Sequence, residues 1–456
     1  MIDTLKERPI SPVSERVTTT VGTDEERVTA ALATFGKTDA LSASAWLRAI
    51  RESARKKAGE LGFPTTNDEE WRFTNVSPVL QLPLHPAAPD RERVTRKDVE
   101  RFGFGLDSYR LVFVNGHFSQ DLSLLPAAGT DFQMGSLAAQ LKSGSAELEK
   151  HLTRHAHYDD NFFAALNTAF FQDGAYVFVA ADKTVPKPVH LLFIGAGSET
   201  GATVFPRSLI IAQRGVHVKI VESHVSLSDL PVVSAAVTEL VLGAEAEIEH
   251  CKVQQESERA FHIATVQAVQ EKDSRWTSHS IATGARLARN NVQTLFGASG
   301  ASAVLNGLYL GHADQLIDHH TVVDHAQPRC ESHEFYHGIL ADRAHGVFNG
   351  KIFVRQDAQK TNAKQTNRNL LLSDNAVMDT KPQLEIYADD VKCTHGAAIG
   401  QLSDEAIFYL RARGIGVDLA RRMLIQAFAS DVIERIGIEP VRVELAKMLG
   451  ERFQST

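Results

Sequence analysis

A long series of short β-rich segments places the strongest constraint on the fold of this 456-residue chain. From residue 176 onward, segments such as YVFVA, VHLLFI and HVKIVES are rich in β-branched residues and are separated by Gly, Asp, Pro or Ser. Later apolar strand centres lie about 13 to 19 residues apart, near Leu308, Val322, Ile339, Ile352, Leu371, Ile386 and Ile399. No helical pattern interrupts the series before about residue 402, so this part of the chain is expected to be β-structure.

The spacing of these segments favours a parallel β-helix over a β-sandwich. Turn signals in sandwiches recur about every 8–12 residues. A β-helix needs a longer, nearly regular period, because each coil stacks on its neighbour. The pairs Asn290-Asn291, Asn306-Gly307 and Asn349-Gly350 are predicted to form corners, since Asn and Gly adopt left-handed backbone at low cost. We therefore expect a mainly β protein with a parallel β-helix core at residues 176–402.

Helical patterns flank the predicted core on both sides. Residues 1–175 form a mainly helical N-terminal region, with apolar residues at helical spacing from Glu25 to Phe35 and from Ala43 to Leu61. A short strand is predicted at Leu111–Val114.

The C-terminal region, residues 403–456, is also expected to be helical. Ser403 is a suitable N-cap for a first helix, and Asp418 is a suitable N-cap for a second helix that runs to Ile436. Helices at both ends would cover the edges of the β-helix, which otherwise promote aggregation.

The composition excludes several classes of protein. A net charge of −8 and a pI near 6.2 argue against a nucleic-acid or anionic-membrane partner. No apolar run approaches the roughly 18 residues of a membrane-spanning helix. The first residues lack the apolar segment of a secretory signal, and Asp3, Glu7 and Glu15 are atypical of a transit peptide. These features predict a cytoplasmic protein.

The three cysteines are too few and too scattered for a self-contained sulfur site. Cys251, Cys330 and Cys393 form neither a disulfide framework nor a CxxC pair, and one chain cannot supply four thiolates. Cys251 alternates with polar neighbours and is predicted to be structural, whereas Cys330 follows a proline at a predicted corner and could be exposed. The nearest match to a phosphate-binding loop, GVFNGKI at residues 346–352, has the wrong spacing, so no nucleotide site is expected.

The tripeptide Cys393-Thr394-His395 is the sharpest candidate for chemistry. Side chains alternate along a strand, so Cys393 and His395 should point to the same side. A thiolate and an imidazole together make half of a ligand set for an iron–sulfur cluster or zinc. Two other interpretations stay open, namely an inert buried thiol beside a hydrogen-bonded histidine and a Cys–His nucleophile pair.

Histidine is concentrated in one stretch of the predicted core. Seven of the nineteen histidines lie there, at His312, His319, His320, His325, His333, His337 and His345. Imidazoles suit iron and zinc, but no HExxH-type spacing organises this group. The favoured interpretation is that these residues form ordinary hydrogen bonds at coil corners and on outer faces.

Three segments resemble the SufB/SufD family of iron–sulfur cluster assembly scaffolds. They are GFPTTNDEEWRFTNV (62–76), FFAALNTAFFQDGAYVFV (162–179) and YADDVKCTHGAAIGQLSDEAIFYLRARGI (387–415). The resemblance extends from about residue 25 to about residue 450. It favours the SufD branch over SufB, because residues 363–375 contain no cysteine and Thr394-His395-Gly396 stands where SufB-like chains have Glu-His-Glu.

The resemblance implies a right-handed parallel β-helix in a non-catalytic scaffold subunit. Such a subunit pairs with a SufB-like scaffold and binds a SufC-like ABC ATPase through its C-terminal helices. It helps iron acquisition and the formation of a transient iron–sulfur cluster at the subunit interface. By this resemblance His395 and Cys393 are the metal- and cluster-binding candidates, and the isolated chain is expected to hold no cluster stably. A homodimer is also possible.

A different class of protein shares the predicted architecture. Polysaccharide lyases and hydrolases built on β-helices use carboxylates and arginines on an outer face, and Asp342, Arg343 and Arg355 would fit such a role. Those enzymes are usually exported, and the missing secretory signal argues against this alternative.

Overall fold

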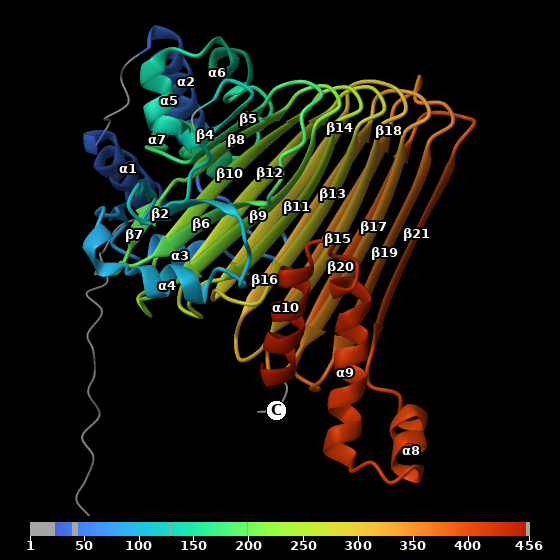
Figure 1. The fold of residues 1–456 in the computed structure, drawn as a ribbon. Coiled ribbons are helices and arrows are strands. Elements are labelled where there is room, and N and C mark those ends of the chain that lie inside the picture. Colours follow the sequence, from blue (N-terminus) through green and yellow to red (C-terminus); the bar gives the residue numbers. More distant parts are fainter. Residues whose placement is uncertain (1–22, 39–43, 128, 198, 453–456) are drawn as a thin grey trace, which may run out of the picture.

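The computed structural model describes residues 23–38, 44–127, 129–197 and 199–452. Its centre is a β-solenoid made of two sheets of parallel strands, which confirms the predicted mainly β fold (Figure 1). The chain alternates between the sheets, so each coil adds one strand to each. The register pairs Leu316 with His345 and Glu331 with Asn362, so one coil takes about 30 residues. The spacing seen in the sequence is therefore half a coil.

The strands follow a simple order in both sheets. One sheet, called sheet A, contains β4 (Phe132–Ser136), β5 (Ala175–Val179), β8 (Arg207–Ala212), β10 (Val233–Leu242), β12 (Phe261–Gln270), β14 (Leu287–Phe296), β16 (Leu316–His325), β18 (His345–Val354) and β20 (Val377–Ile386), with the short β1 (His85–Pro86) and β7 (Ala202–Val204) beside it. The other, sheet B, contains β3 (His117–Phe118), β2 (Tyr109–Val114), β6 (Val189–Gly195), β9 (His217–Ser226), β11 (Glu247–Gln255), β13 (Arg275–Ala282), β15 (Ser302–Gly311), β17 (Glu331–Leu340), β19 (Asn362–Leu371) and β21 (Lys392–Gly400).

The predicted corners are wrong, because the Asn and Gly pairs lie inside strands β14, β15 and β18. Tertiary packing explains why glycine is needed at two of these strand positions. A Cβ atom at Gly307 would collide with the ring of Tyr336, and one at Gly350 would collide with the side chain of Gln365. The real corners use other residues with left-handed backbone, among them Asp273 (φ 57°) and Asp342 (φ 54°).

The N-terminal helices, with one exception, cover the outer face of sheet A. They are α1 (Asp24–Phe35), α2 (Ala45–Leu61), α3 (Ser77–Leu80), α4 (Arg96–Arg101), α5 (Leu137–Ser143), α6 (Ala146–His151) and α7 (Phe162–Phe170). The exception is α4, whose Val99 packs with Val112 and Leu192 on the outer face of sheet B. The helices predicted from Glu25 and from Ala43 are present as α1 and α2, although Ala43 itself lies outside the described residues. The predicted strand at Leu111–Val114 is part of β2, which pairs in parallel with β6 of the solenoid.

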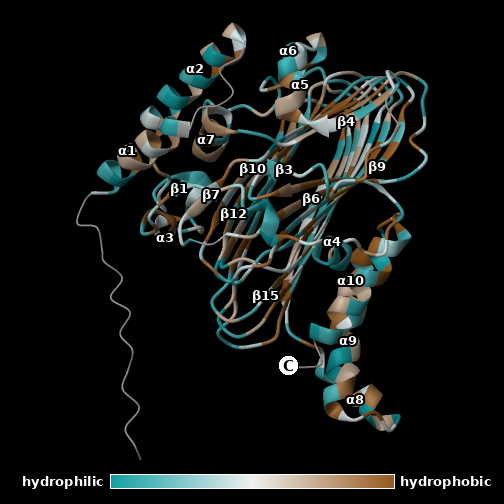
Figure 2. Cartoon of the chain, turned by 60° about the vertical axis from the view of Figure 1, so that its left-hand side comes forward, coloured by the Kyte–Doolittle hydropathy of each residue, from teal (hydrophilic) through white to brown (hydrophobic). Residues whose placement is uncertain are grey.

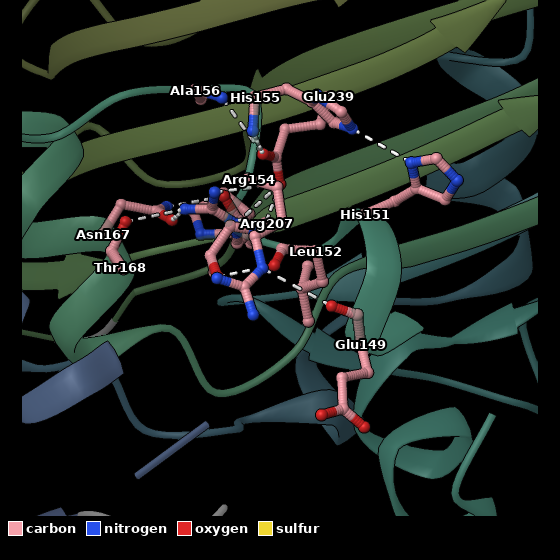
Figure 3. Close-up of polar contacts among 12 residues, drawn as sticks. Glu149, His151, Leu152, Arg154, His155, Ala156, Asn167, Thr168, Arg207 and Glu239 are labelled. Atoms are coloured by element: carbon pink, nitrogen blue, oxygen red, sulfur yellow. Dashed lines mark hydrogen bonds and ion pairs between the residues drawn. The ribbon is translucent and has the colours of Figure 1, made fainter. Parts of the chain in front are cut away.

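A buried ion pair fastens this helical layer to sheet A (Figure 3). The Arg207 guanidinium donates to Glu239 Oε2 (2.9 Å), and both side chains are fully buried. The guanidinium also donates to Asn167 Oδ1 and Thr168 Oγ1 of α7. Glu239 accepts backbone N–H groups of Thr153, His155 and Ala156. Burial alone would raise the pKa of Glu239, but the Arg207 charge and these hydrogen bonds lower it.

We predict that Arg207→Ala lowers the free energy of unfolding by about 3–5 kcal/mol, because it leaves the Glu239 carboxylate buried without a cation. The double variant Arg207→Met, Glu239→Gln should lose less, since it removes both charges together. Urea denaturation measures both effects. Arg343→Ala, which breaks an exposed pair with Asp314, is the control and should change little. Equal effects of Arg207→Ala and Arg343→Ala would contradict the prediction.

The C-terminal helices are α8 (Asp404–Ala412), α9 (Val417–Ile433) and α10 (Glu439–Arg452). Of these, α9 and α10 cover a face of the solenoid and not its edge. Residues of α9 and α10 such as Ile425 and Leu445 pack with Cys251 and Leu308 on the outer face of sheet B. The expectation that helices cover the edge is therefore wrong at this end.

The α8–α9 hairpin projects away from the solenoid, with apolar and polar residues alternating along it (Figure 2). Ser403 caps α8 as predicted, and its side chain accepts from Ala406 N (3.1 Å). The predicted cap of the second helix is wrong. Gly416 is the N-cap of α9, and Asp418 lies inside the first turn, where its charge suits the helix dipole. Within the described part of the chain, we find no helix with the length and apolar character needed to cross a membrane.

Candidate functional site

The two ends of the solenoid differ in how their edges are closed. At the N-terminal end, antiparallel pairing adds β3 to β2 and β4 to β5. At the C-terminal end, β20 and β21 are the last strands, and no strand in the described ranges pairs with their outer edges (Figure 1). Apolar side chains are exposed there, including Tyr387 (60%), Val377 (50%) and Ile399 (46%). This open end exposes both backbone hydrogen-bonding groups and apolar surface.

Strand β21 brings the two predicted site residues to the open end. Cys393 pairs with Ala363 and His395 pairs with Gln365 in the neighbouring β19. Ala363 belongs to the core inside the solenoid, so Cys393 and His395 both face the lumen. Cys393 is half-buried and His395 is exposed. The geometry therefore places a thiol and an imidazole on one uncovered surface.

The local chemistry does not favour a Cys–His nucleophile pair. Burial raises the pKa of the Cys393 thiol, although a hydrogen bond from the Ala363 backbone opposes the shift. An activated nucleophile needs the opposite shift. Among the described residues, no side-chain hydrogen bond or ion pair orients His395, so the third member of a catalytic triad is missing from its surroundings.

A buried carboxyl group lies beneath His395 in the lumen. The register stacks His395 on Gln365 and Gln365 on Glu334. Glu334 accepts a hydrogen bond from Thr321, but its Oε1 atom and the Gln365 amide are buried without well-formed hydrogen bonds. Burial raises the pKa of Glu334 to about 7, although Thr321 and Gln365 oppose the shift. The lumen below the open end therefore contains a group that changes charge near neutral pH.

We predict that Glu334 makes the protein less stable at high pH. Its pKa is about 7 in the folded state, against an ordinary value of 4.5. The folded state thus holds the proton more tightly than the unfolded chain does, and stability present below pH 4.5 is lost as the pH rises through 7. The loss should be roughly 3 kcal/mol for this group.

Glu334→Gln should abolish this loss, since the amide resembles the protonated carboxyl but cannot ionise. Urea denaturation of wild type and variant at pH 5 and pH 8 measures the difference. Glu331→Gln, an exposed position on the same strand, is the matched control. If wild type and Glu334→Gln lose the same stability between the two pH values, the group does not titrate as described.

The seven clustered histidines do not form one site. His319 and His325 face the lumen, where they contact Ser280 and Ser332. The prediction of corners and outer faces is wrong for these two, and burial lowers the pKa of each to about 3. On outer faces, His320 contacts Glu70 (3.3 Å) and the His337 ring donates to the Phe428 backbone oxygen (2.9 Å). Each therefore fastens one strand to a covering element.

The other residues singled out in the sequence do not form a functional site. Cys251 is buried under the C-terminal helices, as predicted. Cys330 is also fully buried, in the core of the solenoid, so the exposed position that the sequence left open is excluded. Arg343 precedes β18 and Arg355 follows it, and the ten-residue strand between them keeps them roughly 30 Å apart. They pair separately with Asp314 and Asp324, so a carbohydrate-active site is not assembled here. Residues 346–352 lie within the strand β18 and form no phosphate-binding loop.

The first of the three sequence segments, residues 62–76, attaches to the outer face of sheet A. The Arg289 guanidinium lies over the Trp71 ring (3.8 Å to its centre), a cation–π contact. Thr74 Oγ1 donates to Asp318 (2.6 Å), which also accepts from Arg289. The segment at 162–179 forms α7 and β5, and the segment at 387–415 forms β21 and α8. All three segments therefore hold the layers together or build the open end.

A second set of lumen residues was missed by the sequence reasoning. Glu222 and His224 on β9 and His250 and Lys252 on β11 point inward. The signal was present in the alternation. In HVKIVESHVS the inward positions are first apolar, at Val218 and Ile220, and then polar at the same parity. Every second position of the strand, continued from Val218 and Ile220, faces inward, and this alternation predicts charged groups inside the solenoid.

Comparison with known proteins agrees with this architecture. Residues 193–428 match the model of the family described as SUF system FeS cluster assembly, SufBD core domain. Residues 36–191 match the SufBD protein N-terminal region. The chain belongs to the SufBD family. This confirms the resemblance predicted from the three segments and places the chain in iron–sulfur cluster assembly by the SUF system.

Relatives in three bacteria illustrate the relationship. An iron–sulfur cluster assembly SufBD family protein of Synechocystis is 34% identical over 414 residues, which cover 88% of this chain and 90% of that protein. SufD of Escherichia coli is 31% identical, with 86% and 90% covered. SufD of Bacillus subtilis is 26% identical, with 90% and 94% covered. The similarity therefore spans all three regions of this SufBD chain.

Proposed function

We propose that this SufBD chain is a non-catalytic scaffold subunit of a cytoplasmic SUF complex. In this complex a SufB-like scaffold adds its own strands to the open end, and a transient iron–sulfur cluster is built between the two subunits. The chain helps to acquire iron and to form the nascent cluster. The observation that supports this best is the terminal coil, where His395 and Cys393 face the lumen on an uncovered edge.

The ligands available to a cluster explain why a partner is needed. Cys251 and Cys330 are fully buried, so Cys393 is the accessible thiol of this chain. One thiol and the His395 imidazole supply two ligands of the four that a cluster commonly takes. The partner would supply the rest, including the principal thiolate. Because imidazole must be neutral to bind metal and is a weaker ligand than thiolate, it suits a cluster that is later handed on.

The edge itself supports strand addition by a related scaffold. Strands β20 and β21 leave one row of backbone N–H and C=O groups unpaired, and a parallel strand of similar length would satisfy them. The apolar side chains of Tyr387 and Ile399 would be buried in the same contact. A second copy of this chain has the same chemistry at its edge, so a homodimer in isolation is the alternative assembly.

We predict that His395→Ala lowers the yield of cluster in the complex with the SufB-like scaffold and the ATPase, because it removes one ligand. Cys393→Ser should have a smaller effect, since the half-buried thiol has a raised pKa. Iron and sulfide analysis after anaerobic reconstitution gives the yield.

Three controls define this experiment. Complex formation and ATP hydrolysis should be unchanged in the His395→Ala variant, and His333→Ala on the exposed outer face of β17 should have no effect on yield. An unchanged yield in an intact His395→Ala complex would falsify the ligand role. Failure of the complex to form would instead make His395 an architectural residue.

The C-terminal region, residues 403–456, is the proposed docking surface for the ATPase. The helices α9 and α10 bury one side against sheet B, while the hairpin exposes Phe408 (72%) and Tyr409 (58%) on α8 and Leu419 and Met423 on α9. Exposed aromatic residues of this kind often dominate binding energy at interfaces. The sequence contains no match to a phosphate-binding loop motif, so we assign ATP hydrolysis to that partner.

We predict that the double variant Phe408→Ala, Tyr409→Ala binds the ATPase at least about tenfold more weakly, because the hairpin loses its largest apolar contacts. Isothermal titration calorimetry with the purified ATPase measures the affinity. Leu61→Ala, at an exposed apolar position of α2 outside the proposed docking surface, is the control. Wild-type affinity in the double variant would place the ATPase elsewhere. Deleting residues 403–456 is a poorer test, since it would also uncover the apolar face of sheet B.

A further inference from the structure

The interior of the solenoid contains a second group of potential metal ligands. His224 on β9, His262 on β12 and Glu256 in the loop after β11 each offer one ligand atom, and these atoms lie within 4.8 Å of one another. His224 and His262 are buried, and Glu256 is 9% exposed. In sheet B, β9 lies six strands from β21, so the group lies roughly 30 Å from His395. It is therefore separate from the open end.

We propose that His224, Glu256 and His262 form a binding site for a divalent transition-metal ion of the ferrous or zinc type. Two imidazoles and one carboxylate are the ligands that hold zinc in many catalytic sites and iron in many oxygenases. Such sites leave one or more coordination positions open to water or another small ligand. Magnesium and calcium prefer oxygen ligands alone, so the two histidines disfavour them.

Neighbouring side chains already orient the first histidine. Glu222 Oε1 contacts His224 Nε2 at 2.8 Å, which leaves Nδ1 as the free nitrogen of that ring. Glu222 is itself fixed, because its Oε2 accepts from Thr238 Oγ1 (2.9 Å) and contacts His250 Nε2 (3.1 Å). A carboxylate behind a histidine is the usual support for a metal-binding imidazole, since it fixes the tautomer and the ring orientation.

The second histidine is held in a similar way. His262 Nδ1 lies 2.8 Å from Glu256 Oε2, and its Nε2 lies 2.7 Å from Lys252 Nζ. The Lys252 ammonium also donates to Asn290 Oδ1, so it is held on the far side of the ring from Glu256. The His262 ring therefore turns Nδ1 toward the Glu256 carboxylate and away from the lysine.

Space and charge both suit a cation at this position. His224 and Glu256 line a cavity of about 30 Å³ together with small residues such as Gly195, Gly197 and Ser234. That volume is large enough for a water molecule or an ion. Two carboxylates, Glu222 and Glu256, face one ammonium group, Lys252, in the network. A bound cation would offset the remaining negative charge in this buried place.

The Lys252 ammonium can only donate to His262 Nε2, so the neutral His262 ring carries its own proton on Nδ1. A metal bound at Nδ1 would require this ring proton to move to Nε2, and Lys252 would release one proton to solvent and accept the Nε2–H, so that the ring stays neutral. Glu256 is the least buried of the three ligands, and it lines the cavity together with His224.

The experiment measures binding of Zn²⁺, and of Fe²⁺ without oxygen, to the untagged full chain by equilibrium dialysis and metal analysis. The background variant Cys393→Ser, His395→Ala removes the proposed cluster ligands. One equivalent of metal should bind, and Glu256→Gln or His262→Gln should weaken binding at least about tenfold. His325→Gln, a buried lumen histidine outside the group, is the control and should bind as the background does. Co²⁺ absorption bands should show the same dependence on Glu256 and His262.

The outcomes separate cleanly. Binding of neither ion, or wild-type affinity in both Glu256→Gln and His262→Gln, overturns the proposal. If His262→Gln does not fold, the metal affinity of Glu256→Gln alone decides the test. This variant should fold, because it replaces a single oxygen atom in the least buried of the three side chains. Binding of zinc but not of iron assigns a structural metal, and binding of both assigns a site that also accepts iron. The cluster ligands are absent throughout, so failure here leaves the proposed function untouched.

Discussion

Coil-on-coil pairing between parallel strands is the constraint on which the rest of the structure depends. Each strand satisfies its backbone donors and acceptors with the strands of the coils before and after it. Such a ladder has no intrinsic end. The last strand at each end is therefore either capped by an antiparallel strand or left with one unpaired edge. The chain closes the first coil with the antiparallel strands β3 and β4 and leaves β20 and β21 open. The position of His395 and Cys393 follows from that asymmetry.

The same constraint explains the two helical regions. Both sheets of this solenoid have apolar residues on their outer faces as well as in the core, and these outer residues need cover. Sheet A is covered by the N-terminal layer, held by the Arg207–Glu239 pair and by Trp71 on Arg289. Sheet B is covered by α9 and α10, and its first strands are covered by α4. Both helical layers therefore lie on faces, and the open edge stays available.

Much of the fold could be predicted from the sequence because its signals are local. The spacing of the β-rich segments predicted the solenoid, and alternation along a strand placed Cys393 and His395 on one side. The failures share a tertiary cause. The pair Asn306-Gly307 resembles a turn, yet Gly307 lies in a strand because the Tyr336 ring packs against it. Likewise, the burial of Cys330 and the grouping of His224 with Glu256 and His262 depend on neighbours a whole coil away, which local patterns do not reveal.

The short connection between β21 and α8 has a mechanical consequence. Residues 401–403 alone join the strand that contains His395 to the projecting hairpin. A movement imposed on α8 would thus pull directly on β21 through these three residues. The second route is almost as short, since Phe428 of α9 stacks on His337 of β17 (4.3 Å between ring centres), two ladder steps from β21. A force applied to α8 therefore has a covalent path of only three residues to the strand that contains His395.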